Sequence, residues 1–116
     1  MTRAGSGRPS EFVSYLQELL QPLGPVAARR MFGGYGLYLD GVMFAIVVDE
    51  ELYFKVDADN QAEFEGAGSE PFRYVRQGRW VALGYYRAPE DALEGAEALT
   101  PWARSAYGAA LRGRKG

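Results

Sequence analysis

The side chains in this chain with the clearest chemical potential are cations interleaved with aromatic rings. They recur in two stretches, one running from Arg29 to Tyr38 and the other from Arg73 to Tyr86, and Lys55 lies between them. Single-strand nucleic-acid binders combine basic and aromatic residues in this way, and arginines equally pair with acidic residues on a protein partner. We expect the partner-binding surface to be formed by Arg29, Arg30, Tyr35, Tyr38, Lys55, Arg73, Trp80, Tyr85 and Tyr86.

The sequence lacks the residues that most catalytic mechanisms use. The chain has no cysteine and no histidine, so it has no thiol nucleophile and lacks the commonest general base and metal ligand. The carboxylates at Asp40, Asp49 to Glu51, Asp57 and Asp59 do not have the spacing of a calcium-binding loop. We interpret them as turn and capping residues, and we expect no catalytic residue, no cofactor and no metal.

Two features leave an alternative open. Gly33-Gly34-Tyr35-Gly36 is rich enough in glycine to cradle a phosphate, but such a loop must open a helix, and here a strand follows. We therefore interpret these glycines as places where a backbone or an aromatic ring packs closely. Lys55 would be a nucleophile only if it were buried with a lowered pKa, and otherwise it decorates the exposed side of a strand.

Length and charge limit the class of protein. At 116 residues we expect one domain over residues 10–112, preceded by a disordered tail at 1–9 and followed by a basic tail at 113–116. The net charge of −2 argues against binding nucleic acid by bulk charge alone. No segment has the pattern of a signal peptide or of a membrane span, which favours a cytoplasmic protein.

Alternating hydrophobicity and turn signals predict five strands. Residues 31–39, 42–48 and 52–57 form consecutive strands, with Asp40-Gly41 as a strong hairpin signal between the first two. Residues 72–76 and 79–86 form a second hairpin around Gln77-Gly78. We expect 42–48, which is apolar throughout, to lie centrally in the sheet.

Three helices complete the prediction. The first runs from a cap at Ser10 to about residue 23, a short one lies within 57–68, and the last begins with Thr100 as cap and Pro101 at the first helical position. The order is α-β-β-β-α-β-β-α. It predicts an α+β fold, a two-layer sandwich with a mostly antiparallel five-stranded sheet.

Five segments in this order resemble the N-terminal domain family of the TfoX/Sxy competence regulators. They read RRMFGGYGLYLDGVMFAIV, LYFKVD, FEGAGSEPFRY, YYRAPEDALE and WARSAYGAAL, and together they cover nearly the whole chain. The resemblance implies a secretion-chaperone-like sandwich. Full-length members carry a second, C-terminal domain and act with the cyclic-AMP receptor protein at promoters. Since the resemblance to the N-terminal domain covers nearly the whole chain, the chain is expected to be a stand-alone N-terminal module.

Three functional hypotheses follow. The first is a non-enzymatic regulatory or protein-interaction module. The transcription machinery is one candidate source of its partner, and a sheet edge is a candidate surface for a homodimer. The second is direct nucleic-acid binding by a basic–aromatic sheet face, with affinity that falls steeply as salt rises. The third is a small-molecule sensor or enzyme that uses Lys55, which would require a closed pocket around that lysine.

Overall fold

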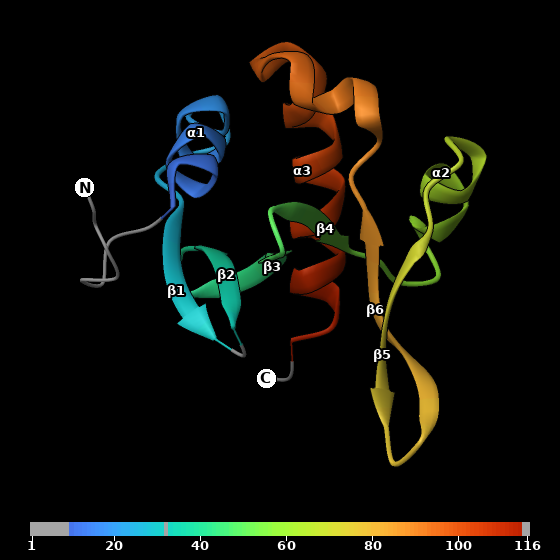
Figure 1. Cartoon of the computed structure of the whole chain (residues 1–116). Helices are drawn as coiled ribbons and strands as arrows, with labels where there is room; N and C mark the ends of the chain where they lie inside the picture. The colour runs from blue at the N-terminus through green and yellow to red at the C-terminus, as the bar shows by residue number, and fades with distance from the viewer. Residues whose placement is uncertain (1–9, 32, 115–116) are drawn as a thin grey trace.

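The computed structural model describes residues 10–31 and 33–114, and the side chains of all of these except 81–83. The predicted tail at 1–9 and the last two residues of the predicted tail at 113–116 lie outside these residues. Figure 1 shows the elements along the chain: α1 (Glu11–Leu19), β1 (Ala27–Met31), β2 (Gly34–Leu39), β3 (Val42–Val48), β4 (Glu51–Lys55), α2 (Gln61–Gly66), β5 (Pro71–Arg76), β6 (Arg79–Arg87), the 3₁₀ helix η1 (Glu90–Glu94) and α3 (Ala96–Arg112).

The fold is α+β, as predicted, but the expected count of five strands is wrong. The described strands form one six-stranded sheet in the order β1-β2-β3-β4-β6-β5. Every pairing in this sheet is antiparallel. The all-apolar strand β3 lies inside the sheet as expected, whereas β1 and β5 are its two edges.

The missing strand lies where the sequence predicted a connector and the start of a longer strand. The strands β1 and β2 occupy residues 27–31 and 34–39, and Gly33 with φ +78° lies between them. β1 escapes a periodicity search because Ala27, Arg29 and Arg30 are all exposed on this edge strand. The element order is therefore α-β-β-β-β-α-β-β-α, with η1 preceding the last helix.

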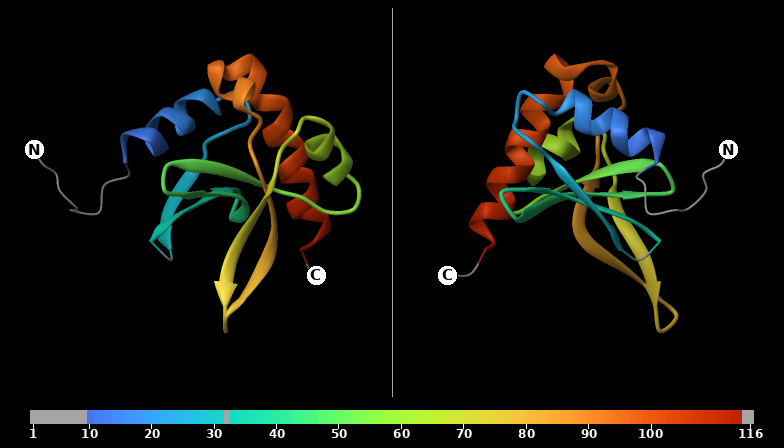
Figure 2. Two further views of the ribbon diagram at one scale, coloured as in Figure 1. Left: turned by 45° about the vertical axis from the view of Figure 1, so that its right-hand side comes forward. Right: turned by 90° about the vertical axis from the view of Figure 1, so that its left-hand side faces the viewer.

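Helices α1 and α3 pack against one face of the sheet, which makes two layers (Figures 1 and 2). The core between them is continuous. It joins Leu16 of α1 and Leu99 of α3 to Phe44 and Phe54 of the sheet, all with no exposed surface. No helix among the described residues is long and apolar enough to cross a membrane.

Three tight turns have the left-handed backbone that hairpins require. Positive φ values occur at Asp40-Gly41 (53° and 78°), Asp49-Glu50 (53° and 60°) and Gln77-Gly78 (54° and 77°). Two successive residues with positive φ are typical of type I′ turns, whose twist matches that of the strands. The predictions of hairpins at Asp40-Gly41 and Gln77-Gly78 are confirmed.

The two long helices begin differently from each other. Ser10 caps α1 as predicted, because its hydroxyl oxygen accepts a hydrogen bond from the Val13 N–H at 3.1 Å. The predicted start of α3 at Thr100 is wrong, since the helix begins at Ala96 and contains Pro101. Leu99 continues the buried stripe of α3, and the Thr100 hydroxyl donates to the Ala96 carbonyl at 2.7 Å instead of capping.

Asn60 ties α2 to the rest of the molecule. Its side-chain oxygen accepts from the Asp57 N–H at 2.7 Å, and its amide donates to the Lys55 carbonyl and to the Ser105 hydroxyl at 3.2 and 3.1 Å. It is only 3% exposed, so each of these bonds satisfies a polar group shielded from water. Asn60 thus fixes the chain between β4 and α2 against α3.

Candidate partner-binding surface

Four residues of the predicted surface meet on the sheet face opposite the helices, which we call the outer face. Residues directly opposite each other on antiparallel strands point to the same face. The register pairs Arg29 with Gly36, Tyr38 with Met43 and Lys55 with Tyr85. None of these belongs to the helix-side core, whereas the residues that alternate with them do, namely Ala28, Leu37, Leu39, Phe54 and Tyr86.

Two cations on the outer face, Arg29 and Lys55, each lie against a tyrosine ring. The guanidinium carbon of Arg29 is 5.4 Å from the centre of the Tyr38 ring, and the Lys55 ammonium nitrogen is 5.2 Å from the centre of the Tyr85 ring. Such contacts contribute about 0.5–1 kcal/mol at partly exposed sites and hold the cation in one place. We call Arg29, Tyr38, Lys55 and Tyr85 the outer-face patch.

The patch rests on a tightly filled apolar layer. Ile46 is 3% exposed although it lies outside the helix-side core. At Gly36, an added side-chain carbon would come within 2.7 and 2.8 Å of the sulfur atoms of Met43 and Met31, and within 3.1 Å of the Tyr38 ring. The interpretation of the glycine run as a place of close packing is therefore confirmed at Gly36, and at Gly34, which lies against the Val47 backbone, but not at Gly33, where an added carbon would meet no atom within 4 Å.

Tyr85 should ionise far above an ordinary tyrosine. Burial, and secondarily the neighbouring Tyr38, raises the pKa of Tyr85 from 10.0 to about 12. Because the unfolded chain releases this proton near pH 10, the contribution of Tyr85 to stability is complete below pH 10 and is lost as pH rises from 10 to about 12. NMR of tyrosines labelled at Cζ would measure the shift, with Tyr85→Phe assigning the signal. A Tyr85 signal that titrates near pH 10 would contradict it.

The remaining predicted residues do not join this patch. Arg30 pairs with Tyr35, which packs against the helix-side core, so Arg30 points to the opposite side from Arg29. Tyr86 also lies in that core and donates its hydroxyl to the Glu65 carboxylate at 2.8 Å. This bond raises the pKa of Tyr86 and lowers the pKa of Glu65.

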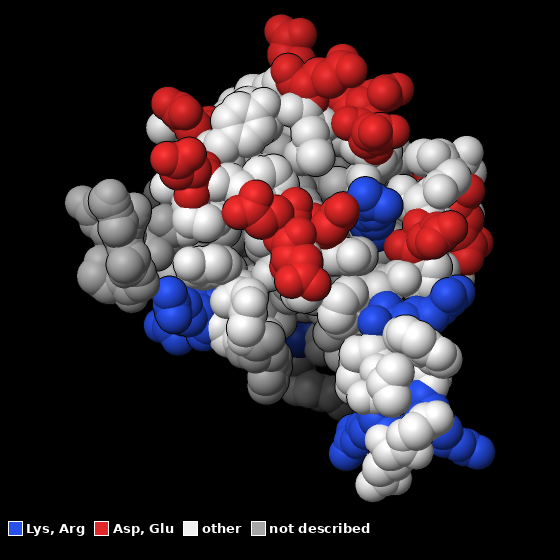
Figure 3. All heavy atoms as spheres, in the orientation of Figure 1, with Lys and Arg blue, Asp and Glu red and all other residues white. Residues whose placement is uncertain are grey.

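Arg73 and Trp80 form a separate group on the β5–β6 hairpin. The hairpin projects from the body of the molecule, and basic side chains gather around it (Figures 1 and 3). Trp80 is 73% exposed and lies directly opposite Val75, which is 56% exposed. Pro71, Arg73 and Trp80 line a shallow hollow of about 330 Å³. The hairpin therefore presents an apolar pair beside a cation.

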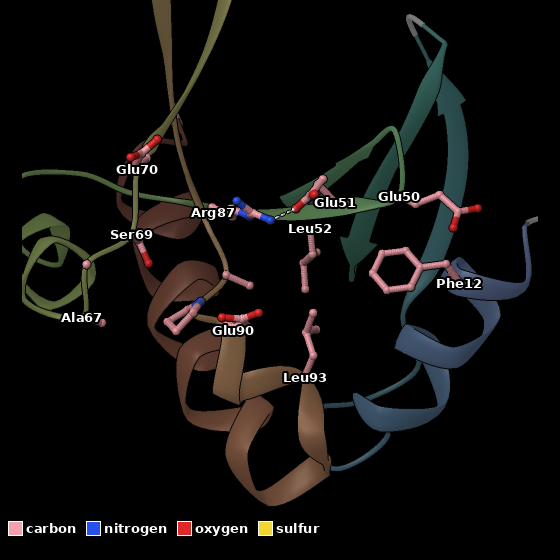
Figure 4. A pocket seen from close by; sticks show the side chains of 13 residues that line it. Phe12, Glu50, Glu51, Leu52, Ala67, Ser69, Glu70, Arg87, Glu90 and Leu93 are labelled. Carbon is pink, nitrogen blue, oxygen red and sulfur yellow. Dashed lines mark ion pairs between the residues drawn. The ribbon is translucent and has the colours of Figure 1, made fainter.

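The sequence did not predict a cavity at the other end of this hairpin. It has a volume of about 550 Å³ and is bordered by the carboxylates of Glu50, Glu51, Glu70 and Glu90 (Figure 4). Arg87 is the one cation among the described residues that line it, and it forms an ion pair with Glu51 at 2.7 Å. The available sequence signal is the acidic stretch Asp49 to Glu51, which from the sequence alone is interpreted only as turn and capping residues.

Neither described cavity contains Lys55. Within the described part of the chain, no group of three or more Asp, Glu, His or Cys residues is arranged to hold a metal ion. Lys55 is half-buried on the outer face against Tyr85. The described candidate site is therefore a surface on which two cations lie against tyrosine rings, and not a closed pocket around Lys55.

An antiparallel sheet that is covered by helices on one face (Figure 2), and on whose other face two cations lie against tyrosine rings, defines a small two-layer α+β domain. The chain belongs to the TfoX N-terminal domain family, whose model matches residues 18–110.

Two curated relatives are similar to this chain. DNA transformation protein TfoX1 of Aliivibrio fischeri is 33% identical over 82 residues, which is 67% of this chain and 39% of that protein. Protein Sxy of Escherichia coli K12 is 33% identical over 99 residues, which is 83% of this chain and 46% of that protein. The chain thus spans less than half the length of either relative.

Proposed function

We propose that this protein is a non-enzymatic regulatory module that binds an acidic protein partner through the outer-face patch. One observation carries the proposal: Arg29 and Lys55 are both held against tyrosine rings on the same uncovered sheet face. A stacked guanidinium loses little further freedom on binding and keeps its N–H donors for a carboxylate. The membership of the TfoX N-terminal domain family supports a regulatory role related to competence.

The charges of the patch are free for a partner. Among the described residues, neither Arg29 nor Lys55 forms an ion pair, whereas Arg87 and Arg112 do. Charged groups at an interface chiefly set the rate of association and the choice of partner. The proposed partner is therefore a protein with a carboxylate-rich surface, and the transcription machinery is the first place to look for it.

Adjacent arginines on opposite faces give a matched test. We expect Arg29→Glu to weaken partner binding at least about tenfold, while Arg30→Glu, with the same change in charge one residue away, leaves it nearly unchanged. The measurement is affinity co-purification from the native host's lysate at low salt, identified by mass spectrometry and followed by titration of the purified partner. Circular dichroism of both variants checks that they are folded.

The recovery pattern decides the proposal. A transcription factor or polymerase subunit that is retained by Arg30→Glu and lost by Arg29→Glu supports it. Equal loss in both variants would show that bulk charge, not the outer face, governs binding, and would overturn it. Failure to recover any specific protein with the unchanged chain would also count against it.

Direct nucleic-acid binding is a second candidate, favoured by the 73% exposure of Trp80 beside Arg73 on the projecting hairpin. Bases stack on exposed aromatic rings, and arginines follow the phosphate backbone. This candidate requires nuclease-sensitive recovery that is lost in Trp80→Ala and kept in Arg29→Glu. The two functions are thus separated by which variant fails.

A further inference from the structure

We infer that this protein forms a two-fold symmetric dimer through strand β5, which continues the sheet into a second copy. β5 is an edge strand that pairs only with β6 among the described strands. An unpaired edge presents backbone donors and acceptors to another strand. The inference concerns a surface different from the outer-face patch and holds whether or not the proposed partner is found.

The hairpin turn determines which backbone groups of β5 face outward. Gln77-Gly78 is a two-residue turn, so Arg76 and Arg79, which flank it, form a hydrogen-bonded pair. The bonding alternates along the strand, and Tyr74 therefore also bonds to β6. Arg73 and Val75 are left with their N–H and C=O groups directed away from the sheet, toward the solvent.

One register of pairing between the two β5 strands best satisfies the outward N–H and C=O groups of Arg73 and Val75. With the two-fold axis at Tyr74, Arg73 of one copy faces Val75 of the second copy, and each such pair exchanges two N–H···O=C bonds. This register avoids placing arginine opposite arginine, which is destabilising. It also places Pro71, which has no N–H, opposite the turn residue Gln77, where the pairing of the two strands has ended.

The side chains on both faces support this register. Phe72 and Tyr74 stack with ring centres 6.3 Å apart on the outer face, so the two copies of Tyr74 would meet there as an aromatic pair. On the helix side, Trp80 and Val75 form the exposed apolar pair of the hairpin. In the dimer, Arg73 of the second copy would lie beside Val75 and reach the Trp80 ring, as cations do.

The charges along β5 complement each other under the same symmetry. The turn residues 77–78 would face residues 70–71 of the second copy, so Arg76 and Arg79, which flank the turn, would lie near Glu70, which borders the acidic cavity (Figure 4). Glu70 forms no ion pair among the described residues. The hydroxyl oxygen of Ser69 is buried there without a hydrogen-bond partner in the described part of the chain. The basic tip of each hairpin would thus lie near the acidic base of the hairpin in the other copy.

The absence of cysteine from the sequence allows a clean geometric test. In this register the two Tyr74 residues form a non-hydrogen-bonded pair with Cα atoms about 4.5 Å apart, which is within the roughly 4.4–6.8 Å range of disulfides. We expect Tyr74→Cys to form a disulfide-linked dimer under mild oxidation. The control Asp40→Cys, in the exposed β2–β3 turn, should remain monomeric by non-reducing electrophoresis.

Sedimentation velocity from micromolar to near-millimolar protein measures the association itself. We expect a dimer that Val75→Pro abolishes, because proline removes an outward N–H that β6 does not use. The control Val75→Thr keeps that N–H and should still dimerise. Arg76→Glu/Arg79→Glu should weaken the dimer at least about tenfold, and adding Glu70→Arg should restore part of the loss.

The contrary results are equally definite. A chain that stays monomeric at every concentration and gives no Tyr74→Cys disulfide would overturn the inference. So would a dimer that survives Val75→Pro, because it must then use another surface such as the opposite edge strand β1. The first of these results would leave the comparison of Arg29→Glu with Arg30→Glu unaffected, since both of those residues lie on β1 and not on β5.

Discussion

Replacing Phe64 by alanine should cost about 3–5 kcal/mol of the free energy of unfolding. Phe64 has no exposed surface, and its ring centre lies 6.2 Å from that of Phe54, 6.3 Å from that of Tyr86 and 4.8 Å from that of Trp102. The short helix α2 supplies this one buried side chain. Removing it would leave a cavity between sheet, α2 and α3 that three rigid rings cannot fill.

Urea unfolding followed by circular dichroism would measure this loss. For a domain whose total stability is about 5–15 kcal/mol, we expect a large fall in the midpoint, and Phe64→Leu should cost less than half as much because it keeps more of the buried volume. Trp102 fluorescence in a Trp80→Phe background would report the loosened contact directly. A loss below about 1 kcal/mol would mean that α2 does not anchor the core.

Gly34→Ala should cost about 3 kcal/mol, near the upper end for overpacking. An added side-chain carbon at Gly34 would collide with the backbone carbonyl of Val47, and it would lie 3.2 Å from the carbon of that carbonyl. A flexible side chain can move aside, but Val47 is held in the ladder between β2 and β4. The clash can be relieved only by disturbing this pairing.

The matched control for Gly34→Ala is Gly66→Ala at the end of α2. An added carbon at Gly66 meets no atom within 4 Å, and alanine favours helix by up to about 1 kcal/mol over glycine. We therefore expect opposite signs from the same chemical change, measured by urea unfolding. Equal effects at Gly34 and Gly66 would show that β2 can move away from β3.

The sequence predicted correctly those parts of the fold that a few neighbouring residues determine by themselves, through a capping hydrogen bond or a turn conformation. The cap at Ser10 and the turns at Asp40-Gly41 and Gln77-Gly78 are such cases. The prediction from sequence was wrong where the burial of an apolar side chain outweighed a local signal. Thr100-Pro101 resembles a helix start, yet burying Leu99 extends α3 by four residues before Thr100. Strand β1 was missed because it is an exposed edge strand and does not show the alternation of apolar and polar residues on which the strand prediction relied.

The candidate surface was predicted in composition but not in arrangement. Arg29 and Arg30 were grouped because they are adjacent in sequence, and adjacent strand residues point to opposite faces. Tyr86 was included as an aromatic, but its hydroxyl is bonded to Glu65 from a helix twenty-one residues earlier. The acidic cavity joins four separate segments, so no spacing in the sequence could indicate it.

The uneven distribution of charge gives the molecule an electric dipole that its net charge of −2 conceals. On the face shown in Figure 3, acidic side chains gather over the helices and the β3–β4 turn, and basic ones around the β5–β6 hairpin. The molecule extends 42 × 39 × 33 Å, whereas charges are screened over about 8 Å at physiological salt. A polyanion that approached this protein would therefore interact chiefly with the charges nearest to it, and those around the hairpin (Figure 3) would favour its approach there despite the negative net charge.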